Sequence, residues 1–179
     1  MSENLTARLW LMRAAFVALC FVVIFWQLLP METVPRRFTG PDVLMVLCVL
    51  WVLRRPDFAP PVVIAALVLL ADFVFLRPPG LMALATFLVA ENLRSRSVGL
   101  RDMPFTVEWL TAAGAMAAIV VGNRLLSTLF LLDLPSLGLT LIQLIMSVLV
   151  YPALAFLLYI FLGLRRISPS DPELLQGRV

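Results

Sequence analysis

The sequence predicts an all-α fold, a polytopic bundle of membrane-spanning helices. Of its 179 residues, 62% are hydrophobic and 14% charged, and the mean hydropathy is +1.01. An ordinary globular domain is about half apolar and a quarter charged. The apolar residues form long runs between short polar segments that hold most of the Arg residues. These observations predict a transmembrane bundle over 14–164, with a cytoplasmic N-terminus (1–13) and a cytoplasmic C-terminal tail (165–179).

The first apolar run, 14–31, predicts an uncleaved transmembrane helix that ends near Pro30. It follows Arg8 and Arg13, as a signal peptide would. However, it is too long for the apolar region of a typical signal peptide, lacks a small-residue cleavage site and precedes further apolar segments.

Three short apolar segments follow, at 42–53, 60–76 and 81–93. A helix of twelve residues covers only about 18 Å, whereas the hydrocarbon core of a bilayer is about 30 Å thick. These segments must therefore draw on flanking polar residues, thin the bilayer locally or be partly re-entrant.

Two long apolar segments close the bundle, at 108–132 and 138–163, after a polar stretch at 94–108. Pro152 lies inside the last segment. Because proline removes one backbone hydrogen bond, a kink is expected there, which membranes tolerate when neighbouring groups compensate.

The Arg residues predict orientation, since positive charge collects on the cytoplasmic side. Six helices with the N-terminus inside place ten Arg residues in the cytoplasm and three outside. Five helices, with 42–53 re-entrant and the N-terminus outside, also place ten inside. Six is preferred, because 42–53 contains no Gly or Pro to reverse the chain and a re-entrant segment needs protein around its backbone. The ten cytoplasmic residues of the six-helix arrangement are Arg8, Arg13, Arg54, Arg55, Arg94, Arg96, Arg101, Arg165, Arg166 and Arg178; the three outer ones are Arg36, Arg37 and Arg77.

Small residues recur at four-residue steps in segment 108–132, at Gly114, Ala118 and Gly122. In lipid, such a ridge lets two helices approach closely. It predicts a helix-packing face, either within the chain or for the transmembrane helix of a partner.

Ionisable residues inside apolar segments are costly and are candidates for function. Asp72 lies within an apolar run, five residues before Arg77, and Arg124 lies within another. With Asp42, these residues could form a polar cluster beneath the outer surface. A buried ion pair of Asp72 with Arg124 or Arg77 is expected, either structural or part of a ligand or partner site. Asp42 itself is predicted to cap the helix that begins after it.

The remaining polar and aromatic residues suggest structural roles. Arg54 and Arg55 are expected to form a cytoplasmic stop signal, with Pro56 ending the helix. Cys20 and Cys48 are expected to pack as small apolar side chains. All four tryptophans lie near segment ends and are expected to anchor the helices at the interface: Trp10, Trp26, Trp51 and Trp109.

Several kinds of chemistry find no support in the sequence. The chain has no His, no phosphate-binding Gly-rich loop, no nucleophile elbow and no metal-binding Cys cluster, so an enzyme, a metal site and a cofactor are not expected. No basic run exceeds two residues, so no nucleic-acid partner is expected either.

One passage resembles a known family. PDVLMVLCVLWVLRRPD (41–57), then Asp72, then Arg77-Pro78-Pro79-Gly80-Leu81 resemble, in order and spacing, the MreD family of rod shape-determining inner-membrane proteins. The family signature positions in this chain are Pro41, Asp42, Arg54, Arg55, Pro56, Asp72, Pro78 and Gly80.

The resemblance implies a non-catalytic scaffold of the bacterial cell-wall elongation machinery. Such a protein would bind the bitopic MreC and link the lateral-wall peptidoglycan synthases to MreB filaments. The family has also been likened to the six-helix substrate-binding membrane subunits of vitamin transporters. A membrane subunit that binds a substrate or a lipid, with its pocket on the outer side, is therefore the alternative function.

Overall fold

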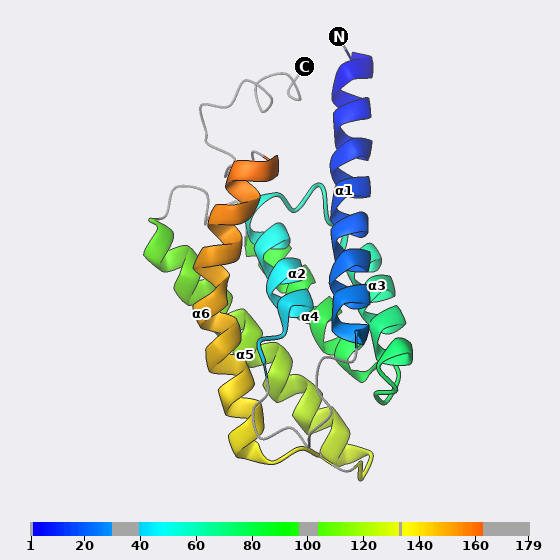
Figure 1. The fold of residues 1–179 in the computed structure, drawn as a ribbon, viewed down its shortest axis with the longest axis vertical. Helices are drawn as coiled ribbons and strands as arrows, with labels where there is room; N and C mark the ends of the chain where they lie inside the picture. Colours follow the sequence, from blue (N-terminus) through cyan, green and yellow to red (C-terminus); the bar gives the residue numbers. More distant parts are fainter. Residues whose placement is uncertain (1, 30–39, 97–103, 133, 163–179) are drawn as a thin grey trace.

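The computed structural model describes residues 2–29, 40–96, 104–132 and 134–162, and all regular structure within them is helical. Consecutive helices alternate in direction, so α1 begins and α6 ends at the same end of the bundle (Figure 1). We call this the Arg54 end, because α2 also finishes there, and the opposite end, with the α3–α4 turn, the Arg77 end. The six helices are α1 (Ser2–Leu28), α2 (Val43–Arg54), α3 (Pro61–Val74), α4 (Leu81–Arg96), α5 (Phe105–Leu129) and α6 (Leu137–Leu162).

The all-α class is confirmed, and the five later helices begin and end within three residues of their predicted bounds. The first helix differs, because α1 begins at Ser2 rather than at residue 14. Neither Gly nor Pro occurs before Pro30, so nothing in the polar N-terminal residues interrupts the helix. It stops shortly before Pro30, whose ring disfavours helical geometry in the preceding residue.

Within the part of the chain that the structure describes, three helical stretches are long and apolar enough to cross a membrane: Leu9–Leu28, Phe105–Leu129 and Leu137–Phe161. Helices α2 and α3 are apolar but shorter. The long stretches expose large apolar side chains such as Phe25, Leu125 and Ile160. An outward apolar surface on several helices is typical of contact with lipid.

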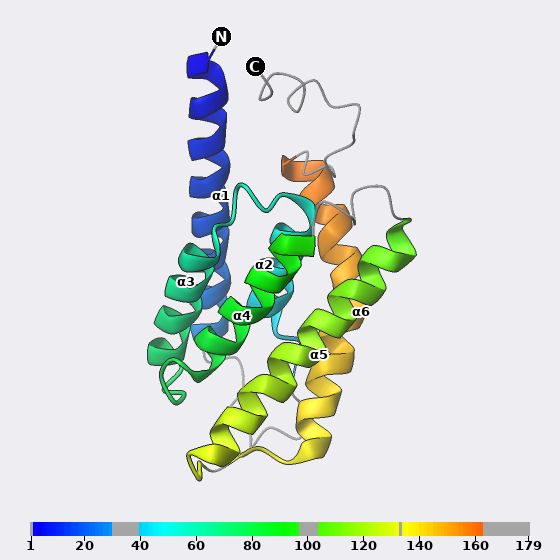
Figure 2. The same cartoon turned by 180° about the vertical axis from the view of Figure 1, so that it is seen from behind.

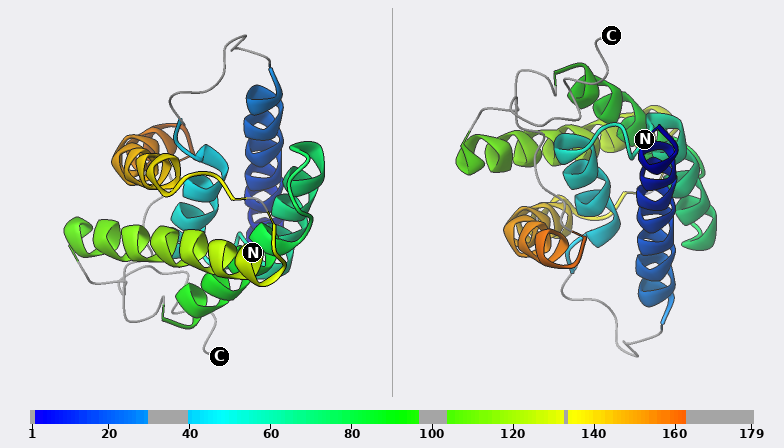
Figure 3. Two further views of the ribbon diagram at one scale, coloured as in Figure 1. Left: turned by 90° about the horizontal axis from the view of Figure 1, so that it is seen from below. Right: turned by 90° about the horizontal axis from the view of Figure 1, so that it is seen from above.

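The short helix α2 lies at the centre of the bundle. Nine consecutive residues, 44–52, are buried, and α2 contacts α1, α4, α5 and α6. Viewed along the bundle, α2 lies between α1 and α6 (Figure 3), and α4 and α5 cover it from behind (Figure 2). A helix that is apolar all round is expected to be buried. Its position in the core removes the need for α2 to match the bilayer thickness on its own.

The prediction that Trp51 anchors its helix at the membrane interface is wrong. Rather than anchoring α2 at the interface, its side chain is fully buried against Phe16 of α1, with ring centroids 5.1 Å apart. Its indole Nε1–H has no hydrogen-bond partner. Cys20 of α1 and Cys48 of α2 are both buried, as predicted for small apolar side chains.

Candidate functional site

The start of α2 is fixed by Asp42. As predicted, its Oδ1 accepts a hydrogen bond from the backbone N–H of Met45 at 3.1 Å, which satisfies one of the free donors of the first turn. Its backbone N–H donates to Oγ of Ser147 in α6 at 2.9 Å. The Ser147 hydroxyl in turn donates to the carbonyl of Gln143 at 2.8 Å. Pro41-Asp42 therefore ties the beginning of α2 to the middle of α6.

Asp72 is the second buried carboxylate, with a relative exposure of 1%. Its Oδ2 accepts from the backbone N–H of Gly80 at 3.1 Å, directly before α4 begins at Leu81. The carboxylate of α3 therefore caps the N-terminus of α4, where free amide donors and the helix dipole favour negative charge.

The expected ion pair of Asp72 with Arg124 is therefore wrong, and among the described residues no contact within 4 Å joins Asp72 to Arg77, although the charge of Arg77 acts on Asp72 at longer range. Arg77 pairs instead with Asp42, with Nη1 3.7 Å from Oδ2. Arg124 donates instead to Oγ1 of Thr140 on α6, at 3.0 Å. The physical reason is that backbone amides at the start of α4 satisfy Asp72, so a cation is not required.

The α3–α4 turn explains why these groups meet. After α3, the N–H of Leu76 donates to the carbonyl of Phe73 and the N–H of Arg77 to that of Asp72, a Schellman closure with Leu76 at φ 52°. The chain then passes Pro78 and reaches Gly80 at φ 88°, a backbone conformation that favours glycine. The Arg-Pro-Pro-Gly sequence thus brings the first amides of α4 back to the end of α3.

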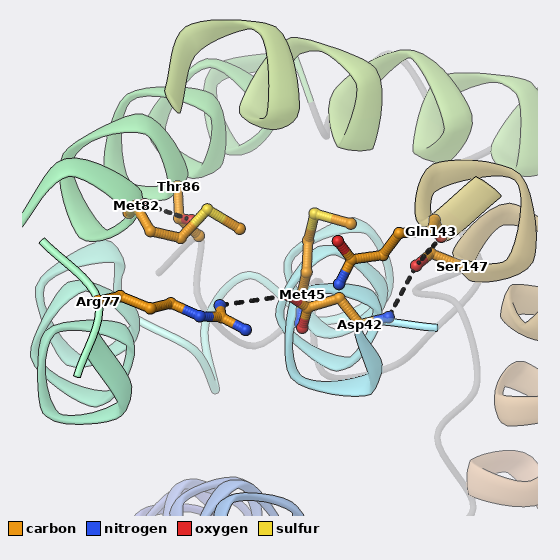
Figure 4. A network of polar contacts seen from close by, with 7 residues as sticks. All are labelled: Asp42, Met45, Arg77, Met82, Thr86, Gln143 and Ser147. Carbon is orange, nitrogen blue, oxygen red and sulfur yellow. Dashed lines mark hydrogen bonds and ion pairs between the residues drawn. The ribbon is translucent and has the colours of Figure 1, made fainter. Parts of the chain in front are cut away.

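Asp42, Asp72 and Arg77 line one hollow between α2, α3 and α4, with a volume of about 290 Å³ including its open mouth. Three of the four residues of the predicted polar cluster therefore come together, and Arg124 does not. Arg77 extends from the turn toward Asp42 (Figure 4). The other polar or polarisable side chains of the wall are Met45, Met82 and Thr86. Among the described residues, no group of three or more His, Cys, Asp or Glu could hold a metal ion.

A second polar cluster lies at the Arg54 end. Nε of Arg54 donates to Oε1 of Glu108 at 2.9 Å, and the hydroxyl of Tyr151 donates to the same oxygen at 2.7 Å. Arg54 also donates to the carbonyl of Ala155 at 3.2 Å. The side chains of Arg54 and Glu108 are only 11% and 5% exposed. Arg54 is therefore more than a stop signal, because it joins α2 to α5 and α6.

The two other residues of the predicted stop signal remain near the helix end. The backbone N–H of Arg55 bonds to the carbonyl of Trp51 at 2.8 Å and closes α2. The Arg55 guanidinium lies 5.7 Å from the centroid of the Phe58 ring, and Pro56 is buried. The Arg-Arg-Pro sequence thus ends α2, as predicted.

Trp109 compensates for the proline in α6. Pro152 has no N–H, so the carbonyl of Val148, four residues earlier, lacks its usual helical donor. Nε1 of Trp109 donates to that carbonyl at 2.9 Å. Helix α6 therefore continues through Pro152, with α5 supplying the missing hydrogen bond.

We expect the exchange Trp109→Phe to lower the free energy of unfolding by about 1–3 kcal/mol, because it leaves the Val148 carbonyl without its donor. The same exchange in a Pro152→Ala background should cost less, since the alanine introduced there has a backbone N–H that would bond to that carbonyl. Unfolding of the four purified proteins in detergent measures this difference. An equal loss in both backgrounds would refute the compensation.

The small-residue ridge divides between two surfaces. A Cβ added to Gly122 would lie 3.6 Å from Cβ of Ala85 on α4, so this residue faces a helix of the same chain. Gly114 and Ala118 are exposed, and a Cβ added to Gly114 would meet no atom within 4 Å. The part of the ridge at Gly114 and Ala118 is therefore a shallow, unoccupied strip on the outside of α5.

Comparisons with models of known protein families, with curated proteins and with solved structures found no match to this chain.

Proposed function

We propose that this chain is a non-catalytic scaffold of the bacterial inner membrane, of the MreD kind. In this proposal it binds an MreC-like partner with a single transmembrane helix and, through it, links the lateral-wall peptidoglycan synthases to MreB filaments. The motif that suggests the family, at 41–81, forms one connected unit of α2, α3 and the start of α4. Within it Asp42 caps α2, Asp72 caps α4, and Arg77 reaches back to Asp42.

The observation that carries the proposal is the outward position of Gly114 and Ala118. Large exposed side chains flank them along the same face of α5, Leu110 on one side and Val121 and Leu125 on the other. The small residues therefore form a notch into which another helix could pack closely. The other helices of this chain leave the notch open, which favours a partner's helix there.

The proposed topology has six membrane spans, both termini in the cytoplasm and the Arg77 end outside. It is supported by the alternating directions of the helices (Figure 1). Helix α2 starts from the side where α1 ends and finishes at the Arg54 end, as a crossing segment would. The excess of Arg on the segments that join at the Arg54 end favours this orientation.

We expect the exchange Ala118→Leu to weaken co-purification of an MreC-like partner while leaving the amount of folded protein unchanged. Because Ala118 is exposed, a leucine there would extend away from the bundle, but it would fill the notch. Co-expression of the two proteins, followed by affinity capture and quantification of both, measures the effect.

The matched control is Ala153→Leu, the same change at an exposed alanine of α6. It should leave co-purification unchanged. Undiminished capture with Ala118→Leu, or equal losses with both variants, would remove the notch as the partner site. Loss of rod shape in cells that carry only the Ala118→Leu protein would connect the contact to cell shape.

A second candidate function is a membrane subunit that binds a substrate or a lipid. The hollow lined by Asp42, Asp72 and Arg77 favours it, because ionisable side chains buried in a helical bundle often mark a ligand site. Binding by the purified protein without a partner distinguishes this function from the scaffold.

A further inference from the structure

The hollow lies between the start of α2 and the α3–α4 turn, below the outermost turns of α6. The backbone N–H of Asp42 is bonded to Ser147, which lies ten residues after the start of α6 at Leu137. At 1.5 Å per residue, this contact is about 15 Å along α6. The longer helices α5 and α6 thus extend past the polar start of the short helix α2.

Most polar groups of the hollow are already bound to the protein. Oδ2 of Asp72 accepts from Gly80 at the start of α4, and the hydroxyl of Thr86 donates to the carbonyl of Met82 in its own helix at 2.8 Å. Oδ1 of Asp42 caps α2. The charged groups that face each other across the hollow are Oδ2 of Asp42 and the guanidinium of Arg77.

These two groups form a loose pair of opposite charges. Their separation of 3.7 Å exceeds the 2.7–2.9 Å or so that is usual for a charge-assisted hydrogen bond. The Arg77 side chain is 43% exposed, and its guanidinium carbon lies 5.2 Å from the centroid of the Phe75 ring. Because Arg77 is half-exposed and the contact is long, a ligand can displace Arg77 at small cost, whereas Asp42, at 10% exposure, then needs a new counter-charge.

A ligand that carried only one charge would leave the opposite group of the pair without its counter-charge. A ligand with both charges satisfies both groups. A primary ammonium can donate to Asp42, and a phosphate or carboxylate can accept from the forked N–H groups of Arg77. The thioethers of Met45 and Met82 in the wall suit the short carbon link between the two charges.

We propose that this hollow binds a zwitterionic group, with its ammonium on Asp42 and its anionic oxygens on Arg77. The enclosed part of the hollow is only about 10 Å³, room for about one water molecule, so the group would bind at its open mouth, where the half-exposed Arg77 lies. The same chemistry is present in the phosphoethanolamine headgroup of a lipid and in a free amino acid. The inference rests on the second candidate function, a subunit that binds a substrate or a lipid, and not on the scaffold proposal, since both paired groups belong to this chain.

The experiment uses the full chain in nanodiscs of phosphatidylcholine, without and with phosphatidylethanolamine or phosphatidylglycerol, and reads lipid retention by native mass spectrometry. Free phosphoethanolamine and free alanine are added to the phosphatidylcholine discs and read by thermal shift. Phosphatidylcholine lacks N–H donors on its ammonium, and phosphatidylglycerol lacks the ammonium. Preferential retention of phosphatidylethanolamine identifies the lipid as the source. A thermal shift with the free compounds alone identifies a soluble zwitterion.

Two variants locate the site. Asp42→Asn keeps a side-chain oxygen that can cap α2 but removes the charge, and Arg77→Gln removes the guanidinium; each should weaken binding about tenfold or more. Arg124→Gln, at the same end but outside the hollow, is the matched control and should leave binding unchanged. Three results would each overturn the proposal. The first is equal retention of all three lipids with no effect of the free zwitterions. The second is retention of phosphatidylglycerol as strong as that of phosphatidylethanolamine, and the third is full binding by both hollow variants.

Discussion

Replacing Glu108 with Gln is expected to lower the free energy of unfolding by about 3–5 kcal/mol, the usual cost of removing one partner from a buried ion pair. Glu108 accepts from both Arg54 and Tyr151 through one carboxylate oxygen. The exchange removes the negative charge of Glu108, whose Oε1 lies 2.9 Å from Nε of Arg54 on α2. The contact between α2, α5 and α6 should loosen at the Arg54 end. Unfolding of the purified protein by increasing SDS in mixed micelles measures the loss.

The control is Glu91→Gln, which neutralises an exposed carboxylate of α4 and should change stability little. A reciprocal exchange, Arg54→Glu with Glu108→Arg, should recover part of the loss, because the two charges would still face each other. A loss with Glu108→Gln no larger than that with Glu91→Gln would show that the pair does not hold the three helices together.

Replacing Asp72 with Ala is expected to cost about 1.5–3 kcal/mol, the range for a hydrogen bond to a charged group. The change would leave the N–H of Gly80 at the start of α4 without the acceptor that now lies at 3.1 Å. Asp72→Asn should cost less, because an amide oxygen can accept the same hydrogen bond. The same SDS titration measures both variants.

The structure also predicts that a second, compensating substitution at Arg124 will not restore the stability lost at Asp72. Exchanging the charges, with Asp72→Arg and Arg124→Asp, should not restore stability, because Asp72 bonds to Gly80 and Arg124 to Thr140. Recovery in the exchanged protein would instead establish the ion pair that the sequence suggested. Normal stability of Asp72→Ala would show that the cap contributes little.

The helices could be predicted because apolar runs and their Pro boundaries are local properties of the sequence. The helix cap at Asp42 could be predicted for the same reason, since cap and helix adjoin. The start of α1 was missed because its polar first residues have no apolar pattern, although they contain no residue that breaks a helix.

The partners of the buried charges could not be predicted in the same way. For Asp72 the sequence favoured an opposite charge, whereas the turn at Pro78 and Gly80 supplied backbone amides. The sequence did contain a signal for this, because a turn that ends in Gly places the start of the next helix beside the end of the previous one.

Glu108 was missed as a partner of Arg54 because the two lie 54 residues apart. Both occupy the same end of the bundle in the six-helix arrangement, so a search for opposite charges at that depth would have paired them. Trp51 was misplaced because its position near a helix end resembles that of an interface anchor. Only the packing shows that the other helices surround α2.

The scaffold proposal and the outer location of the hollow both depend on six membrane spans with the Arg54 end in the cytoplasm. A reporter enzyme that is active only outside the cytoplasmic membrane, fused in turn at residue 1 and within the α3–α4 turn at Pro78, tests this directly. We expect the fusion at residue 1 to be inactive and the fusion at Pro78 to be active. Activity of the fusion at residue 1 would contradict the six-span topology and favour five spans with a re-entrant α2.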